Sequence, residues 1–127
     1  MKKEPFFTIL DQRDSENTAE FDIKICAKHP IFEGHFPGDP ITPGVCILQI
    51  TCDLFSQLKQ QKFFITAVKN AKFMQVIRPL ENPRITFQIS SQLSENQSDY
   101  ELKCVVSHED TTFAKISFTL SPFHKEH

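Results

Sequence analysis

The residues best suited to chemistry lie in one stretch of the chain, 34–45, with the sequence GHFPGDPITPGV. All 3 glycines of the chain and several of its 8 prolines fall in this stretch, so the backbone is specified more tightly here than elsewhere. Its histidine, His35, carries an imidazole, a group that can take up and release protons near neutral pH. We therefore expect a proton-transfer site, although Pro and Gly before an apolar segment are also typical of a plain loop leading into a helix.

A helix entrance follows this histidine at a short distance. Thr42 is suited to the N-cap, Pro43 is suited to the first helical position, and Gly44 has no side chain to cover the neighbouring amide. Unpaired N–H groups at a helix start, together with the helix dipole, stabilise negative charge on an incoming oxygen atom. A base next to such an oxygen-binding site is an arrangement that can form an enolate.

Hydrophobic periodicity predicts the elements that must position these residues. Apolar and polar residues alternate over 21–27, which predicts a strand leading into the site stretch. From Pro43 to about Gln60 the apolar residues, Val45 among them, cover so much of the circumference that we expect a largely buried helix. Further strands are predicted at 63–76, 84–93, 100–107 and 112–120, with turns at 94–98 and 108–110. One long helix inside a curved antiparallel sheet is an α+β architecture.

Length and composition limit the classes of protein. With 127 residues, 39% of them hydrophobic, the chain is expected to form a single domain, 1–127, around one core. A net charge of −2 and scattered Lys and Arg argue against a nucleic acid partner. Apolar runs are too short for a membrane span or a signal peptide, so we expect a soluble, cytoplasmic protein without membrane partners. The tail from 122 to 127 is expected to be frayed.

Other reactive or bulky residues have simple structural explanations. The cysteines form no C-x-x-C pair, which favours free structural thiols over a metal site or disulfides: Cys26, Cys46, Cys52 and Cys104. His29 and His108 are interpreted as turn residues, and the 13 phenylalanines as core rather than as the lining of an acyl tunnel. Six basic residues could form a rim for an acidic carrier protein, although solvated surface charge is the more economical interpretation: Lys59, Lys62, Lys69, Lys72, Arg78 and Arg84.

Two sequence motifs resemble those of a known enzyme family. His35-Phe36-Pro37-Gly38-Asp39-Pro40, followed by Pro43-Gly44-Val45, resembles the active-site signature of the hot-dog-fold 3-hydroxyacyl-acyl-carrier-protein dehydratases of fatty-acid synthesis. A second and less specific match, AVKNAKF at 67–73 followed by Arg78-Pro79-Leu80, resembles the family's strand with a Lys-Phe pair before a bend that contains proline. With the order of elements, the resemblance covers about residues 25–120. It implies a hot-dog fold, in which a curved antiparallel sheet wraps one long central helix.

The resemblance also implies an activity and a set of roles. The implied enzyme is a lyase that dehydrates 3-hydroxyacyl thioesters, carried on acyl carrier protein, to enoyl thioesters. His35 would be the base at the carbon next to the thioester carbonyl, and the N–H of Gly44 would hold the carbonyl oxygen. Phe36, Pro43 and Val45 would contact substrate, and neither a metal nor a bound cofactor is expected. Side-by-side pairing, as a homodimer or higher homo-oligomer, would place the histidine of one chain near the helix of the other.

One position departs from the family pattern. The family has a carboxylate on the central helix, fourteen residues after the histidine, that serves as the acid for the leaving hydroxyl; here this position is Gln49. A primary amide donates and accepts hydrogen bonds but does not deliver a proton at neutral pH. Asp53, one turn further on the same helical face, is a candidate substitute, although a helix carboxylate that is solvated or bonded to a polar neighbour is the more economical interpretation. Glu33, two residues before His35, ranks below it.

Three functions are consistent with these residues. The first is the dehydratase, with an acid other than Gln49. The second is a catalytically weakened homologue that binds acyl thioesters, or a partner subunit that completes the site of an active dehydratase. The third, less expected, is a thioesterase, because such enzymes generally use a carboxylate to activate water and none is tied to the helix entrance. The acyl-chain length and the pathway are left open by the sequence.

Overall fold

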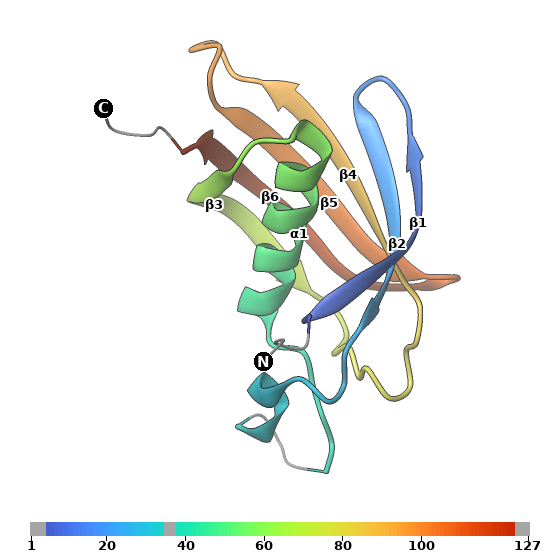
Figure 1. Cartoon of the computed structure of the whole chain (residues 1–127). Helices are drawn as coiled ribbons and strands as arrows, with labels where there is room; N and C mark the ends of the chain where they lie inside the picture. The colour runs from blue at the N-terminus through green and yellow to red at the C-terminus, as the bar shows by residue number, and fades with distance from the viewer. Residues whose placement is uncertain (1–4, 35–37, 124–127) are drawn as a thin grey trace.

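A computed structural model describes residues 5–34 and 38–123, in which one α-helix packs against a six-stranded antiparallel sheet (Figure 1). The strand order in the sheet is β1-β2-β4-β5-β6-β3. This arrangement confirms the predicted α+β architecture. The elements are β1 (Phe7–Asp14), β2 (Thr18–Ile25), the 3₁₀-helix η1 (Pro30–Glu33), α1 (Gly44–Lys59), β3 (Phe63–Phe73), β4 (Ile85–Leu93), β5 (Tyr100–His108) and β6 (Thr111–Pro122).

Strand β1 was not predicted, and the predicted end of β3 was wrong. β1 is an edge strand whose second half is exposed and charged, so it lacks the alternation by which a strand is recognised. β3 was expected to continue to 76, but it ends at Phe73, because the next two amides, of Met74 and Gln75, both donate to the carbonyl of Phe113. Ile77 then pairs with Thr42 in an isolated bridge. At the other end of the chain, β6 includes Pro122, so the prediction that the tail frays from residue 122 was wrong at its first residue. Residues 124–127 lie outside the described part.

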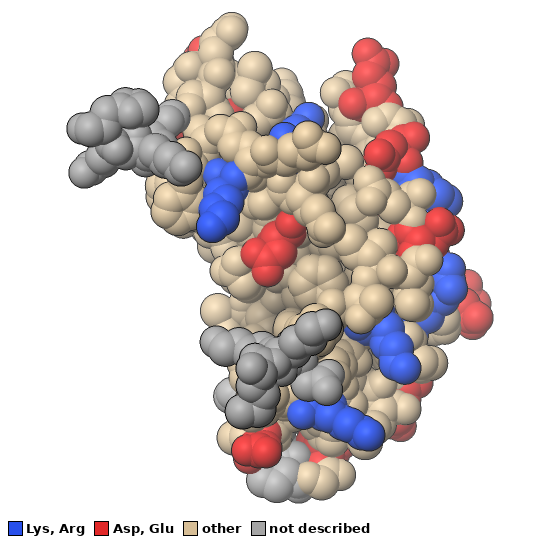
Figure 2. Space-filling model, viewed as in Figure 1, with Lys and Arg blue, Asp and Glu red and all other residues tan. Residues whose placement is uncertain are grey.

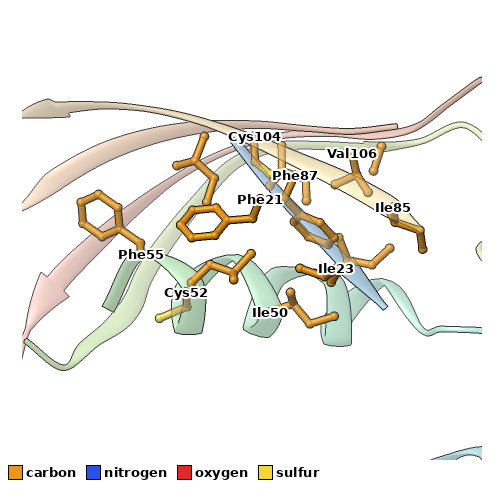
Figure 3. Packing of buried hydrophobic residues seen from close by; sticks show 14 of the residues in the cluster. Phe21, Ile23, Ile50, Cys52, Phe55, Ile85, Phe87, Cys104 and Val106 are labelled. Atoms are coloured by element: carbon orange, nitrogen blue, oxygen red, sulfur yellow. The ribbon is translucent and has the colours of Figure 1, made fainter. Parts of the chain in front are cut away.

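The core lies between one face of the sheet and one side of α1. Figure 3 shows Phe21 and Phe87 from the sheet pointing toward Ile50 and Phe55 of the helix. The prediction of a largely buried helix was therefore wrong for the opposite side. The sheet covers the helix from one direction only, and the side facing away is exposed: Val45, Gln49, Asp53 and Gln57.

Cys46, Cys52 and Cys104 are free thiols, as predicted, and all three are buried. Burial raises the pKa of Cys52 to about 11 and that of Cys104 to about 12, and it also raises the pKa of Cys46. These three thiols are therefore protonated near neutral pH and poorly suited to nucleophilic chemistry. Among the described residues, no group of three or more His, Cys, Asp and Glu could hold a metal ion. No helix in the described ranges is long and apolar enough to cross a membrane.

A buried carboxylate on the outer face of the sheet joins three strands. Asp22 of β2 accepts two hydrogen bonds of 3.0 Å from Arg13 of β1. It also accepts from Arg84, just before β4, and from Thr86 within β4, each at 2.7 Å. These bonds, with the guanidinium of Arg13 contributing most, hold the pKa of Asp22 well below its ordinary value. The cluster fastens the β1–β2 hairpin to the rest of the sheet.

We predict that Asp22→Ala lowers the free energy of unfolding by about 2 kcal/mol, because two arginines and a hydroxyl lose a buried partner. Glu20→Ala is the matched control on the same strand. Glu20 also pairs with Arg13, but at 3.6 Å and with both side chains well exposed, so its loss should change stability by less than about 0.5 kcal/mol. Urea titrations of both variants measure the difference, and equal destabilisation would contradict the assignment.

The same variant has a defined pH dependence. Folding lowers the pKa of Asp22 below its unfolded-state value of about 3.9. The stabilising contribution of Asp22 is therefore fully present above the unfolded-state pKa and is lost as pH falls through the folded-state pKa. The stability difference between wild type and Asp22→Ala should therefore be constant between about pH 5 and 7 and shrink on acidification.

Candidate functional site

Helix α1 begins at Gly44, and Pro43 is its N-cap. The carbonyl of Pro43 accepts from the amides of Cys46 at 3.0 Å and Ile47 at 3.3 Å, which makes it the first helical acceptor. The prediction that Thr42 is the N-cap and Pro43 the first helical residue was thus wrong by one position. The physical reason is tertiary: the N–H of Thr42 donates to the carbonyl of Ile77 at 2.9 Å, which holds Thr42 in a bridge outside the helix.

The helix entrance is open, as the sequence suggested. Pro43 makes no side-chain cap, and no oxygen of the described residues accepts a hydrogen bond from the N–H of Gly44. The first turn also contains no acidic residue. The positive end of the helix dipole is therefore not neutralised by a carboxylate of the first turn, and this N–H group is available to an oxygen atom of a ligand.

A hollow of about 320 Å³ lies beside this entrance. Thr42, Gly44 and Ile47 form one part of its wall, and the segment Phe73–Ile77 forms the other. A Cβ at position 44 would lie 2.9 Å from Cζ of the Phe73 ring, so any larger residue there would displace this half-exposed ring. The lining is mostly apolar and suits a hydrocarbon group.

The fold brings the two sequence motifs together. Nε of Arg78 lies 3.3 Å from Oδ1 of Asp39, at the end of the first motif, and Thr42 is hydrogen-bonded to Ile77. Figure 1 shows η1, the start of α1 and the β3–β4 connection at the same end of the sheet. The loop before the helix is therefore held by the segment that follows β3. His35 and Phe36 lie outside the described residues, so their predicted roles are not placed.

The predicted turn histidines occupy structural positions. His29 is the N-cap of η1, where its Nδ1 accepts from the amide of Ile31 at 3.2 Å, and its ring packs edge-on against Phe6. His108 is the last residue of β5, next to the β5–β6 turn. Glu33, the lower-ranked acid candidate, is an exposed residue of η1.

Gln49 and Asp53 are joined, but they do not line the hollow. Nε2 of Gln49 donates to Oδ1 of Asp53 at 2.8 Å, which confirms that they share one helical face. An α-helix turns by about 100° per residue, so Gln49 lies about 200° around the axis from Ile47, which lines the hollow. The hollow at the helix entrance and the amide–carboxylate pair thus lie on different sides of α1.

The six basic residues that were considered as a possible rim are largely dispersed, as the favoured interpretation of solvated surface charge predicted. Lys69 pairs with Glu101 at 2.5 Å, and Arg78 and Arg84 pair with Asp39 and Asp22. Figure 2 shows few charged side chains on the visible part of the face above α1 and more of them along the β1–β2 edge. Scattered surface charge is therefore the better interpretation.

Two features of the site were missed from sequence. The segment Phe73–Ile77 was interpreted as the end of a strand, and Thr42 as a cap. A signal was present in the run FMQVI at 73–77, where consecutive apolar residues break the alternation expected of a strand. In the structure, the side chains of Met74 and Val76 in this run are each nearly half exposed.

Comparison with known proteins gives consistent matches. Residues 11–117 match the model of the ApeI-like family, described as ApeI dehydratase. The chain is 32% identical over 95 residues to 3-hydroxyacyl-[acyl-carrier-protein] dehydratase FabZ of Lactiplantibacillus plantarum, covering 67% of this chain and 65% of that protein. It is 27% identical over 124 residues to FabZ of Caulobacter vibrioides NA1000, covering 88% and 76%. The chain spans less than two thirds of the length of several FabZ relatives.

Solved structures share the fold at low sequence identity. A dehydratase heterocomplex, ApeI:P from Xenorhabdus doucetiae, aligns with a TM-score of 0.65 and 17% identity over 95% of this chain and 99% of that one. A hypothetical thioesterase with coenzyme A from Streptococcus pneumoniae aligns at 0.59 and 11% identity, over 95% and 91%. The dehydratase domain of the CurF module of curacin polyketide synthase aligns at 0.54 and 18% identity, over 93% and 45%. The architecture is the hot-dog fold, as expected from the sequence motifs.

Proposed function

Because the chain belongs to the ApeI-like dehydratase family, we propose that it removes water from 3-hydroxyacyl thioesters, carried on acyl carrier protein in the cytoplasm, to form enoyl thioesters. The observation that carries this proposal is the N–H of Gly44, which has no acceptor within the described ranges and lies beside an apolar hollow, nine residues after His35 in the sequence. FabZ relatives are named for the same reaction, which supports it.

The first half of the proposed reaction takes place at the carbonyl end of the substrate. His35 removes the proton from the carbon next to the thioester carbonyl, and the electron pair moves toward the carbonyl oxygen. The N–H of Gly44 donates to that oxygen, and a donor placed in this way is worth about 3 kcal/mol to such a transition state. Phe36 and Pro43 are assigned to contacts with the acyl group in this half of the site, whereas Val45, on the exposed side of α1 with Gln49, is assigned to contacts made from the second chain. Neither a metal nor a bound cofactor takes part in these steps.

In the second half the electron pair returns from the carbonyl oxygen and forms the carbon–carbon double bond, while the bond to the hydroxyl oxygen breaks. This oxygen leaves as water and needs a proton. The amide of Gln49 is fixed by Asp53, so its Oε1 can accept from the substrate hydroxyl and orient it. We assign the proton to Asp53, acting directly or through a water molecule. Since this pair lies on the other side of α1 from Gly44, the complete site combines His35 and Gly44 of one chain with Gln49 and Asp53 of a second chain.

The direct test is turnover of 3-hydroxybutyryl-coenzyme A, or of the same group on acyl carrier protein, followed by absorbance of the enoyl thioester. We predict turnover by the wild-type protein and a loss of about 10² to 10⁴ in kcat/KM for His35→Ala. His108→Ala, at a hairpin, is the control and should match the wild type. Absence of turnover, or equal rates for wild type and His35→Ala, would contradict the proposal.

Asp53→Asn tests the acid. Asparagine retains an oxygen that accepts from Gln49 but does not donate a proton as an acid, so kcat should fall about 10² or more while the melting temperature is unchanged. Glu33→Gln neutralises another exposed carboxylate of the same chain and should leave kcat unaltered. If Asp53→Asn retains full activity, the proton comes from another group.

A second candidate function is that of a partner subunit that binds acyl thioesters and completes the site of an active dehydratase. The observation in its favour is Gln49, whose amide already occupies an oxygen of Asp53. A fold relative, ApeI:P from Xenorhabdus doucetiae, is described as a dehydratase heterocomplex, which is consistent with a site completed by two different chains. The turnover assay distinguishes the two candidates, because a partner subunit is inactive alone and active only in a mixture.

We propose further that the chain forms a homodimer through β3. Both β1 and β3 are edges of the sheet, but β1 has charged side chains along its second half, which protect an edge from pairing. β3 is longer and, beside the exposed Lys69 and Lys72, has exposed apolar side chains along its length: Phe64, Val68 and Phe73. Pairing along β3 supports the shared site described above.

Native mass spectrometry tests the dimer. We predict a species of twice 14.7 kDa for the wild type and a monomer for Val68→Lys, because lysine on this edge disfavours strand pairing. Leu10→Lys is the matched control: Leu10 is similarly exposed, at 45% against 47% for Val68, but lies on the opposite edge. A dimer that persists in Val68→Lys places the interface elsewhere.

A further inference from the structure

Thr42 has a hydroxyl whose position the fold does not explain. The residue is 4% exposed, and within the described ranges its Oγ1 is the one buried side-chain nitrogen or oxygen without a hydrogen-bond partner. A hydroxyl buried without a partner destabilises the folded state, and native proteins satisfy nearly all such groups. An exception of this kind calls for a function that the protein gains from it.

The other buried threonine shows how this chain treats a structural hydroxyl. Thr51, on the buried side of α1, donates to the carbonyl of Ile47 at 3.0 Å and lies 3.5 Å from Sγ of Cys104. Thr42 has no comparable bond, although a valine would fill the same space without a polar atom. The hydroxyl of Thr42 is therefore not retained for packing or for capping, since Pro43 is the N-cap.

The location of Thr42 indicates what its hydroxyl contacts. Thr42 lines the hollow at the helix entrance, two residues before Gly44. Its backbone is fixed on both sides, by the hydrogen bond to Ile77 and by Pro43, which follows it. The ring of Phe73 lies against Gly44 in the same hollow and is 48% exposed, so it can rotate away from an entering ligand at little loss of packing.

We propose that the hydroxyl of Thr42 is a second hydrogen-bond donor to the thioester carbonyl oxygen held by the N–H of Gly44, an inference that rests on the function proposed above. Oxygen-binding sites of acyl-transfer enzymes often combine backbone N–H groups with side-chain donors, because charge that develops on one oxygen is stabilised by each of them. The hydroxyl has no partner among the described residues and gains one when the thioester binds. Thr42 thus contacts the substrate and lowers the barrier to proton removal.

Thr42→Val tests this role, with Thr51→Val as the same substitution at a structural site. Turnover of 3-hydroxybutyryl-coenzyme A and thermal unfolding are measured for both. We expect Thr42→Val to lose about 10² in kcat, with a smaller change in KM, and to melt at the same or a higher temperature, because an unpaired buried hydroxyl is removed. Thr51→Val should retain the wild-type kcat. Thr42→Ser, which keeps the hydroxyl, should recover most of the activity.

The outcomes separate this inference from the proposed function. Wild-type kcat in Thr42→Val, or an equal loss in Thr42→Ser, overturns the role of the hydroxyl while the dehydratase stands. If the wild-type protein has no turnover, the dehydratase fails, and the hydroxyl is then tested by the affinity for butyryl-coenzyme A in calorimetry. A weaker affinity in Thr42→Val than in Thr42→Ser supports the contact in that case, and equal affinities overturn it. Thr42→Ala serves as the hydroxyl-free variant if valine impairs folding.

Discussion

Helix α1 buries only one of its sides, because the sheet of a single chain covers it from one direction. Removing apolar surface from water stabilises the fold by about 25 cal/mol per Å², and the large side chains that supply this area come from both layers of the core. The rest of the molecule follows from this one-sided burial. It fixes the rotation of the helix about its axis and leaves Val45, Gln49 and Asp53 exposed.

The same constraint divides the candidate site. The unpaired N–H of Gly44 and the hollow beside it lie on one side of α1, and the hydrogen-bonded pair Gln49–Asp53 lies on another. A helix is rigid on this scale, so no small rearrangement within one chain brings the two halves together. A second copy that pairs along β3 offers a way to unite them, and the exposed apolar residues of β3 suit such pairing better than the charged edge of β1. The proposed oligomer and the proposed chemistry thus depend on each other.

Stability and function are placed on different parts of the fold. On the outer face of the sheet, the buried carboxylate of Asp22 is fully hydrogen-bonded and joins β1, β2 and β4. At the helix entrance, by contrast, the N–H of Gly44 and the hydroxyl of Thr42 have no partners within the described residues. Unsatisfied donors destabilise a folded protein, and they are at the same time the groups that a ligand oxygen can use. This contrast supports an assignment of the entrance, rather than the ion cluster, to binding.

The sequence by itself determined the α+β class, the helix with its open entrance, the later strands and turns, and the pairing of Gln49 with Asp53 on one helical face. These features depend on residues close in sequence, and periodicities of two or 3.6 residues record them directly. Only the tertiary structure decided that Thr42 pairs with Ile77 and lies outside the helix, that Phe73 packs on Gly44, and that β1 completes an edge. It also decided that Val45 is exposed and that Asp39 meets Arg78. These contacts join residues tens of positions apart or depend on which side of a helix meets the sheet, and a local pattern contains no information about either.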